Sequence, residues 1–271
     1  MNIVMSMWTK PCIGNQKHGF NSVEDMINSL IVSVNVAKKH YNEIHFYTDK
    51  VGYEWITPFL HLLPFTKIDV CLNEIDWLDA KYWSLSKLYV YQKQIEPFIH
   101  IDNDVFLWDK FPEELMTKDF FFQEIEEFSN GMFSLYSEGL KTYGKSIPKD
   151  IKVLDAAFNC GVFACVTPKA ISLMGKYYDY GYQFVKNTDE LQFSFIESQS
   201  GRWLATVIIE QVFIYSLVVG NPEFTWDVFL GNSPNRNVSY NFRYSHMLAH
   251  SKRNPIIANK IKERVFCKDW N

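Results

Sequence analysis

The sequence predicts an α/β fold with a mostly parallel central sheet flanked by helices. Over residues 2–101, short apolar runs of strand length alternate with segments whose apolar residues recur at helical spacing. Strands that alternate with helices in this way usually pair in parallel, with helices on both faces of the sheet. Hydrophobic residues make up 47% of the 271 residues, which is enough to fill a sizeable core.

Four strands are expected in the first part of the chain, at residues 2–7, 44–47, 67–72 and 98–101. The first helix should begin at Ser22, because Ser22 followed by Asp25 resembles a capping box. Two further helices are expected at 53–63 and 86–95, each ending before a proline, which cannot continue a helix. A helix therefore separates each expected strand from the next.

The second part of the chain is less regular. Strands are expected at 120–123, 156–166 and 243–248, and helices at 168–185 and 203–219. Pro168 would stand in the first turn of its helix, where a backbone N–H is not needed. No internal repeat, low-complexity tract or linker interrupts the sequence, so residues 1–271 are expected to form one domain.

Charge and cysteine content exclude several classes of protein. The formal net charge is −4 and the pI is about 6.0, so nucleic acid is not an expected partner, and small molecules or glycans are favoured. The five cysteines form no C-x-x-C pair, which argues against a disulfide framework and a cysteine-rich zinc site. Reduced thiols of this kind are typical of the cytoplasm.

No membrane-spanning segment is expected. The N-terminus, MNIVMSMW, lacks the basic and apolar regions of a signal peptide. The longest apolar stretch, residues 203–220, is interrupted by Glu210 and Gln211, which would be costly in lipid. This stretch is therefore expected to be a buried helix, and peripheral membrane association is left open.

Asp102 and Asp104 follow the expected strand at 98–101 directly and are separated by one residue. Ligands of open α/β sheets bind beyond the carboxyl ends of the strands, so both carboxylates are expected at the binding crevice. Hard oxygen ligands suit Mg²⁺ or Mn²⁺, and such a cation also binds diphosphate oxygens and acts as a Lewis acid. The alternative for so short a motif is a capped turn or a solvated loop.

Three longer segments place this motif in context. They are WSLSKLYVYQKQIEPFIHIDNDVFLW at 83–108, DAAFNCGVFACV at 155–166 and SHMLAHSKRNP at 245–255. In this order they resemble the motifs of glycogenin-like glycosyltransferases. The resemblance implies the Rossmann-like, nucleotide-sugar-binding GT-A fold and transfer of a hexose from a nucleotide sugar, with UDP as the expected nucleotide. The acceptor would be a glycan or a lipid-linked molecule.

The resemblance also implies roles for three residues in the first two segments. Lys87 would face the diphosphate as a point charge; an exposed helix lysine is the alternative. Asn159 would bind hydroxyl groups of the donor sugar, and Gly161 would let the backbone approach that sugar closely. For Asn159 the alternative is a structural hydrogen-bond partner, which any buried asparagine needs.

In the third segment, His246 would complete the metal shell of Asp102 and Asp104, and Lys252 would contact phosphate. The two residues keep the six-residue spacing of the family motif, although Ala249 stands where the family usually has glycine. His250 is the competing candidate for the metal. The implied cofactor is Mn²⁺ or Mg²⁺, with the nucleotide sugar as co-substrate.

Further site residues follow from shorter motifs. The pair Glu210 and Gln211 resembles an Asp-Gln pair that faces the reacting sugar; a buried, hydrogen-bonded pair is the alternative. Trp8, Thr48 and Asp49 stand at the ends of the first two strands, where they could touch the nucleotide.

The resemblance favours retention of the anomeric configuration. An inverting enzyme would instead need a general base, for which Asp155, Glu124 and Glu210 are candidates. Residues 112–154 have no counterpart in the family, so Glu124, Glu126 and Glu127 receive no role from the resemblance.

Three rival classes share parts of this pattern. A phosphatase of the haloacid dehalogenase type also uses strand-D-x-D, but Phe106 stands where Thr or Val normally follows. A sugar nucleotidyltransferase usually opens with a glycine-rich loop, and Met5 to Gly14 contains one glycine. A non-catalytic nucleotide- or glycan-binding module is the third rival. The presence of the candidate site residues Asp102, Asp104, Asn159 and His246 argues against it.

Overall fold

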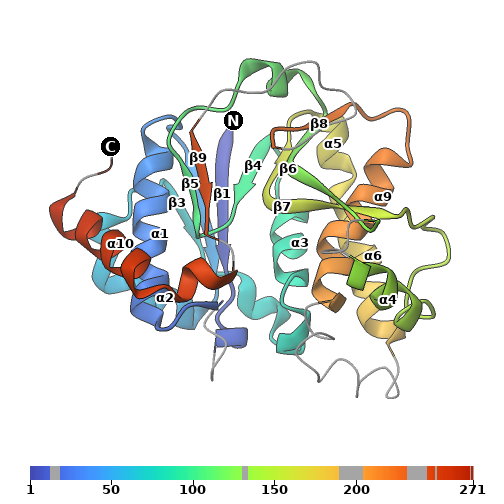
Figure 1. The fold of residues 1–271 in the computed structure, drawn as a ribbon, viewed down its shortest axis with the longest axis horizontal. Helices are drawn as coiled ribbons and strands as arrows, with labels where there is room; N and C mark the ends of the chain where they lie inside the picture. Colours follow the sequence, from blue (N-terminus) through green and yellow to red (C-terminus); the bar gives the residue numbers. More distant parts are fainter. Residues whose placement is uncertain are drawn as a thin grey trace. The chain divides into compact units, whose positions relative to one another are not determined.

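The computed structural model of the protein describes residues 1–12, 19–129, 134–188, 204–230, 243–247, 249–268 and 270. The chain folds into two compact units. Figure 1 shows the helices and strands of both units as a ribbon. Unit 1 contains Met1–Trp77, Phe98–Pro112 and Asn241–Asn271, and unit 2 contains Leu78–Pro97 and Glu113–Tyr240. Compact units need not be separate domains, so the single domain at 1–271 stays a prediction.

Unit 1 contains four parallel strands in the order β3-β2-β1-β4. They are β1 (Asn2–Met7), β2 (Ile44–Thr48), β3 (Lys67–Asp69) and β4 (Phe98–Ile101). Because the strands are parallel, their carboxyl ends lie at one edge of the sheet. Trp8, Asp49 and Asp102 each follow the last residue of a strand and therefore share this edge.

Helices flank these strands. In α1 (Val23–Lys38), the Ser22 side chain accepts a hydrogen bond from the backbone N–H of Asp25, as the capping-box pattern predicts. The helix α2 (Lys50–Ile56) begins three residues earlier than expected, because Asp49 caps it, and it continues as a 3-10 helix to Leu62. β3 ends at Asp69, before the expected Leu72, where another 3-10 helix begins.

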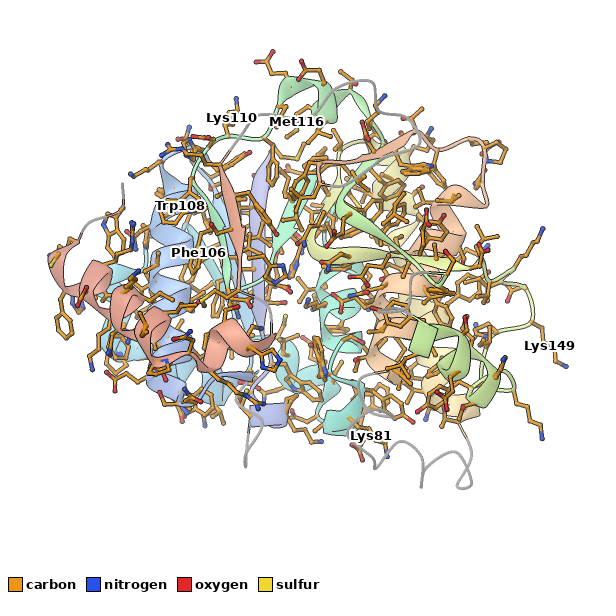
Figure 2. The ribbon with its side chains drawn as sticks, in the orientation of Figure 1. Lys81, Phe106, Trp108, Lys110, Met116 and Lys149 are labelled. Atoms are coloured by element: carbon orange, nitrogen blue, oxygen red, sulfur yellow. The ribbon has the colours of Figure 1, made fainter. Side chains whose placement is uncertain are left out.

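A two-stranded antiparallel sheet also belongs to unit 1. It pairs β5 (Val105–Leu107) with β9 (Tyr244–His246), and Val105 lies opposite His246. β9 is the late strand expected at 243–248, although Leu248 lies outside the described residues. Phe106 and Trp108, two residues apart, have ring centroids 6.0 Å apart (Figure 2). The final helix, α10 (Pro255–Cys267), packs against α1.

Unit 2 contains three strands in the order β7-β6-β8, with β6 (Phe120–Glu127) between β7 (Ala156–Cys165) and β8 (Trp226–Val228). β6 pairs antiparallel with β7 and parallel with β8, and its pairing with β7 is irregular between Phe122 and Glu124. β6 extends four residues past the expected end at Gln123, because its outer half continues to pair with β7.

The helices of unit 2 are α3 (Leu85–Gln92), α4 (Ser134–Thr142), α5 (Pro168–Ser172), α6 (Met174–Asn187) and α9 (Phe213–Val219). The single helix expected at 168–185 is two helices that meet at Leu173. Gly181 of α6 lies close to α3: a Cβ there would be 2.7 Å from a methyl carbon of Leu85. The helix expected at 203–219 includes a π-helical turn at Ile208–Val212, and Trp203 lies outside the described residues.

The predicted α/β class, with mostly parallel strands and flanking helices, is therefore confirmed. Within the described part of the chain, no helix combines the length and apolar character needed to cross a membrane.

Candidate active site

Asp102, Asp104 and His246 lie together in unit 1. The two aspartates follow β4, and the pairing of β5 with β9 brings His246 beside them. Each residue offers one ligand atom, and these atoms lie within 4.8 Å of one another. The Nε2 atom of His246 is 3.7 Å from Oδ1 of Asp104. Among the described residues, the group includes His246 and not His250, which is exposed.

Backbone and side-chain hydrogen bonds hold the loop that carries the aspartates. Asn103 donates its side-chain amide to the carbonyl of Ser6 at 3.0 Å, and its own carbonyl accepts from the Ser29 hydroxyl at 3.0 Å. The Asp104 carbonyl accepts from the backbone N–H of Met247 at 3.0 Å. The last bond ties the loop directly to the segment that carries His246, so the group does not depend on side-chain contacts alone.

The chemistry of the three side chains fits a divalent cation. Two carboxylates and an imidazole are ligands that Mn²⁺ and Mg²⁺ accept. Ligand atoms around one octahedral Mg²⁺ lie roughly 3 to 4 Å apart. The observed limit of 4.8 Å therefore requires only a small approach of the side chains. Asp104 is 3% exposed, and a carboxylate buried to this extent needs a positive partner.

Lys252 supplies such a partner. Its Nζ atom lies 2.6 Å from Oδ2 of Asp104, and the Lys252 side chain is 20% exposed. Lys252 belongs to a 3-10 helix, Ala249–Arg253, which follows β9. The lysine that the resemblance assigns to phosphate thus contacts a carboxylate assigned to the metal.

The residues expected to touch the nucleotide have structural bonds of their own. The Thr48 hydroxyl donates to the Met7 carbonyl at 2.8 Å. The Asp49 carboxylate accepts from the backbone N–H groups of Thr9 and Gly52, each at 2.7 Å. Trp8 is buried at 2% exposure. These bonds account for the placement of Thr48 and Asp49 at the sheet edge, and their contact with a nucleotide stays a prediction.

In unit 2, Lys87 and Glu210 form a buried ion pair. Nζ of Lys87 lies 2.7 Å from Oε1 of Glu210, and the two side chains are 10% and 4% exposed. Lys87 is therefore not an exposed helix lysine. The Glu210 carbonyl accepts hydrogen bonds from the Tyr177 hydroxyl and the Cys160 thiol. π-helical turns such as the one that carries Glu210 are frequent at functional sites.

Gln211 is half-buried beside this pair. Its buried Oε1 atom has no hydrogen-bond partner in the part of the chain that the structure describes. Asp155, the other residue predicted to act in catalysis, is exposed just before β7. The catalytic roles of Glu210, Gln211 and Asp155 stay predictions.

Asn159 lies in β7 and is 7% exposed. Its side-chain amide donates to Oε1 of Glu126 at 2.8 Å, and its side-chain carbonyl accepts from the N–H of Gly161 at 3.0 Å. The second oxygen of Glu126 accepts from the Tyr136 hydroxyl at 2.5 Å. Asn159 thus has the structural partners that a buried asparagine needs, and the bond to Glu126 is one of the two that its NH₂ group can donate.

Glu126 is one of the three glutamates to which the resemblance gave no role. The sequence did hold a clue to the role of Glu126: a buried Asn159 needs a hydrogen-bond partner, and a neighbouring strand is where such a partner lies. Burial raises the pKa of the Glu126 carboxyl above its ordinary value of 4.5, and the hydrogen bonds from Tyr136 and Asn159 partly oppose this. The neighbouring charge of Glu124 adds to the rise.

Stability is expected to depend on pH through Glu126. Above pH 4.5 and up to the raised pKa, the folded protein binds more protons at Glu126 than the unfolded chain does. The free energy of unfolding should therefore fall as pH rises through this range. Glu126→Gln should make urea-unfolding free energies less dependent on pH, whereas Glu127→Gln, at an exposed position of the same strand, should not. Equal pH slopes for the wild type and Glu126→Gln would contradict the role of this carboxyl.

Comparison with known proteins places the chain in a family without an assigned activity. A family of unknown function, DUF6734, matches residues 1–269. No curated protein matches the chain.

Several solved glycosyltransferase structures are distantly similar. Mouse xyloside xylosyltransferase 1 in its apo form is 13% identical, with 84% of each chain covered and a TM-score of 0.42. An active-site mutant of LgtC is 10% identical over 99% of this chain and 96% of that one, with a TM-score of 0.44. The glycosyltransferase GlyE of Streptococcus pneumoniae TIGR4 is 12% identical over 97% of this chain and 64% of that one, with a TM-score of 0.37. All three TM-scores lie below 0.5, so function has to be argued from the site itself.

Proposed function

The chain belongs to this family of unknown function, and we propose that it is a metal-dependent glycosyltransferase. It transfers a hexose from a nucleotide-sugar donor, with UDP as the nucleotide, to a glycan or lipid-linked acceptor. The observation that carries the proposal is the group of Asp102, Asp104 and His246 beyond the carboxyl end of a parallel strand. Ligands of open α/β folds bind at this edge.

The proposed chemistry is confined to what these side chains can do. Asp102, Asp104 and His246 would hold Mn²⁺ or Mg²⁺, which, when bound, neutralises negative charge on the departing diphosphate. Lys252 would add a positive charge for a phosphate oxygen, since its flexible stem carries a compact ammonium. Burial of Asp104 strengthens each of these electrostatic contacts, because the surroundings screen charge less than water does.

The residues of unit 2 enter the proposal with the roles that the motif resemblance implies. Asn159 would donate an amide hydrogen to a sugar hydroxyl, and Gly161 would allow close approach of the backbone. Lys87 would contact the diphosphate, and Glu210 and Gln211 would face the reacting sugar. The transfer would retain the anomeric configuration of that sugar. A cytoplasmic location belongs to the same proposal and is supported by five free cysteines, four of them buried.

A thermal-shift screen of nucleotide sugars, with and without Mn²⁺, tests the proposed function. A donor at about 100 times its dissociation constant should stabilise the fold by about 2.7 kcal/mol, which is a shift of several degrees. We expect this shift with a UDP-hexose in Mn²⁺ and a much smaller one in EDTA. If none of the nucleotide sugars raises the melting temperature, either with Mn²⁺ or in EDTA, the proposal is contradicted. Release of pyrophosphate from UTP and a sugar phosphate would instead favour a sugar nucleotidyltransferase.

Asn159→Ala is expected to separate sugar binding from nucleotide binding. The variant should bind UDP within about twofold of the wild type but hydrolyse the UDP-hexose about ten- to a hundredfold more slowly, the cost of one or two lost hydrogen bonds. Calorimetry with UDP and a hydrolysis assay measure the two effects. An equal loss of UDP binding and turnover would indicate that Asn159, with its bonds to Glu126 and Gly161, has a structural role alone.

A further inference from the structure

One carboxylate of the candidate metal group already contacts a cation from the protein itself. The ammonium of Lys252 is 2.6 Å from Oδ2 of Asp104, while Oδ1 of the same carboxylate is 3.7 Å from His246. Asp104 is buried, so its negative charge is neutralised here by Lys252 rather than by water. A divalent cation that binds Asp104 must share or replace this contact.

The surrounding segment holds Lys252 in this position. Its 3-10 helix is fastened to residues 19–21: Asn21 donates its side-chain amide to the Arg253 carbonyl at 3.0 Å, and Nε of Arg253 donates to the Gly19 carbonyl at 3.3 Å. Nζ of Lys252 lies 5.4 Å from the ring centroid of Phe20. Gly19 has a φ of +85°, and a Cβ there would be 3.3 Å from Cδ of Lys252. The lysine stem therefore packs closely against Gly19.

We propose that Lys252 competes with the divalent cation for Asp104, so that the cation binds tightly only when a diphosphate draws the ammonium away. The inference rests on the proposed function, because it concerns the same metal group. Two cations beside one carboxylate repel each other, most strongly where water is scarce.

A diphosphate resolves this competition. Lysine binds phosphate as a point charge on a flexible stem, so its ammonium can turn from Asp104 to a phosphate oxygen while its backbone stays in the 3-10 helix. The cation then gains Asp104, and the diphosphate gains both cations. Binding of each ligand therefore favours binding of the other, and by linkage the factor is the same in both directions.

The test measures binding of Mn²⁺ alone, by electron paramagnetic resonance, to the wild type and three variants of the whole chain. Lys252→Met keeps the apolar stem and removes the charge, so it should bind Mn²⁺ about tenfold or more tightly than the wild type. Lys252→Arg keeps a positive charge beside Asp104, so it should bind Mn²⁺ as weakly as the wild type does. Lys262→Met is the matched control, because Lys262 pairs with Glu24 at the surface of α10 and should leave Mn²⁺ affinity unchanged.

Each outcome has one meaning. If Lys252→Met binds Mn²⁺ with the same affinity as the wild type, or more weakly, the proposed competition between Lys252 and the cation is wrong. The assignment of the metal site is then unaffected. Tighter binding in Lys262→Met as well would show a general charge effect and would also overturn the proposed competition. Failure of both the wild type and Lys252→Met to bind Mn²⁺ contradicts the metal site itself, and with it the proposed function. Lys252→Gln serves as a second charge-removing variant if the methionine variant does not fold.

Discussion

Asp104→Asn is expected to abolish Mn²⁺ binding and to lower nucleotide-sugar turnover by about a thousandfold or more. Asparagine keeps the shape of the side chain but removes the charge that holds the cation. The electrostatic stabilisation that a bound metal supplies is worth several kcal/mol, and each 1.36 kcal/mol corresponds to a factor of ten in rate. Hydrolysis of a UDP-hexose in saturating Mn²⁺ measures the loss.

The fold of this variant should stay largely intact. The bond from the Met247 N–H to the residue 104 carbonyl involves only the backbone. Lys252, the partner that stays charged in this variant, has a side chain that is 20% exposed, so its ammonium can reach water. Asp109→Asn is the matched control: Asp109 lies in the same segment and pairs with Arg243 at the surface. It should keep wild-type turnover. Wild-type hydrolysis by Asp104→Asn in Mn²⁺ would show that the metal site is assigned to the wrong residues.

Lys87→Met is expected to destabilise the protein by about 3–5 kcal/mol, the usual cost of removing one partner from a buried ion pair. The Glu210 side chain is 4% exposed, so its carboxylate would lose an ammonium 2.7 Å away without gaining water. Urea unfolding monitored by circular dichroism measures the change. The double variant Lys87→Met and Glu210→Gln should recover most of the loss, because no charge is then left buried.

Lys81→Met provides the control for Lys87. Lys81 (Figure 2) is a buried lysine of the same unit, but its partner Asp79 has a side chain that is 55% exposed and would stay solvated. Lys81→Met should therefore lower the free energy of unfolding by less than Lys87→Met does. Equal stability of Lys87→Met and the wild type would show that the ion pair is not structural. Lost turnover in that stable variant would then support the diphosphate role of Lys87.

Local patterns in the sequence predicted the parts of the fold that local chemistry determines. The Ser22 cap and the strand before Asp102 each depend on residues that are close in the chain. β5 escaped prediction because it is three residues long and pairs with a strand about 140 residues later. The π-helical turn at Ile208–Val212 has the apolar composition of an ordinary helix, so only its hydrogen bonds distinguish it.

In the candidate site, too, motifs within short segments were informative, whereas most contacts between distant segments were not predicted. Motif spacing singled out Asp102, Asp104 and His246, and the structure brings their ligand atoms together. The partners of Lys87 and Asn159 were not predictable, because these contacts join distant segments and no motif links them. Lys87 and Glu210 are 123 positions apart, and Asn159 and Glu126 are 33 apart. Apart from the metal group, sequence reasoning therefore named most of the polar residues without saying which of them contact one another.

An anomalous-difference map at the manganese edge, from crystals grown with Mn²⁺ and UDP, tests the central claim most directly. The account predicts the strongest peak in direct coordination by Asp102, Asp104 and His246, with Lys252 moved from Asp104 to a phosphate oxygen. A manganese peak on other residues, or no peak with Lys252 still paired to Asp104, would contradict it.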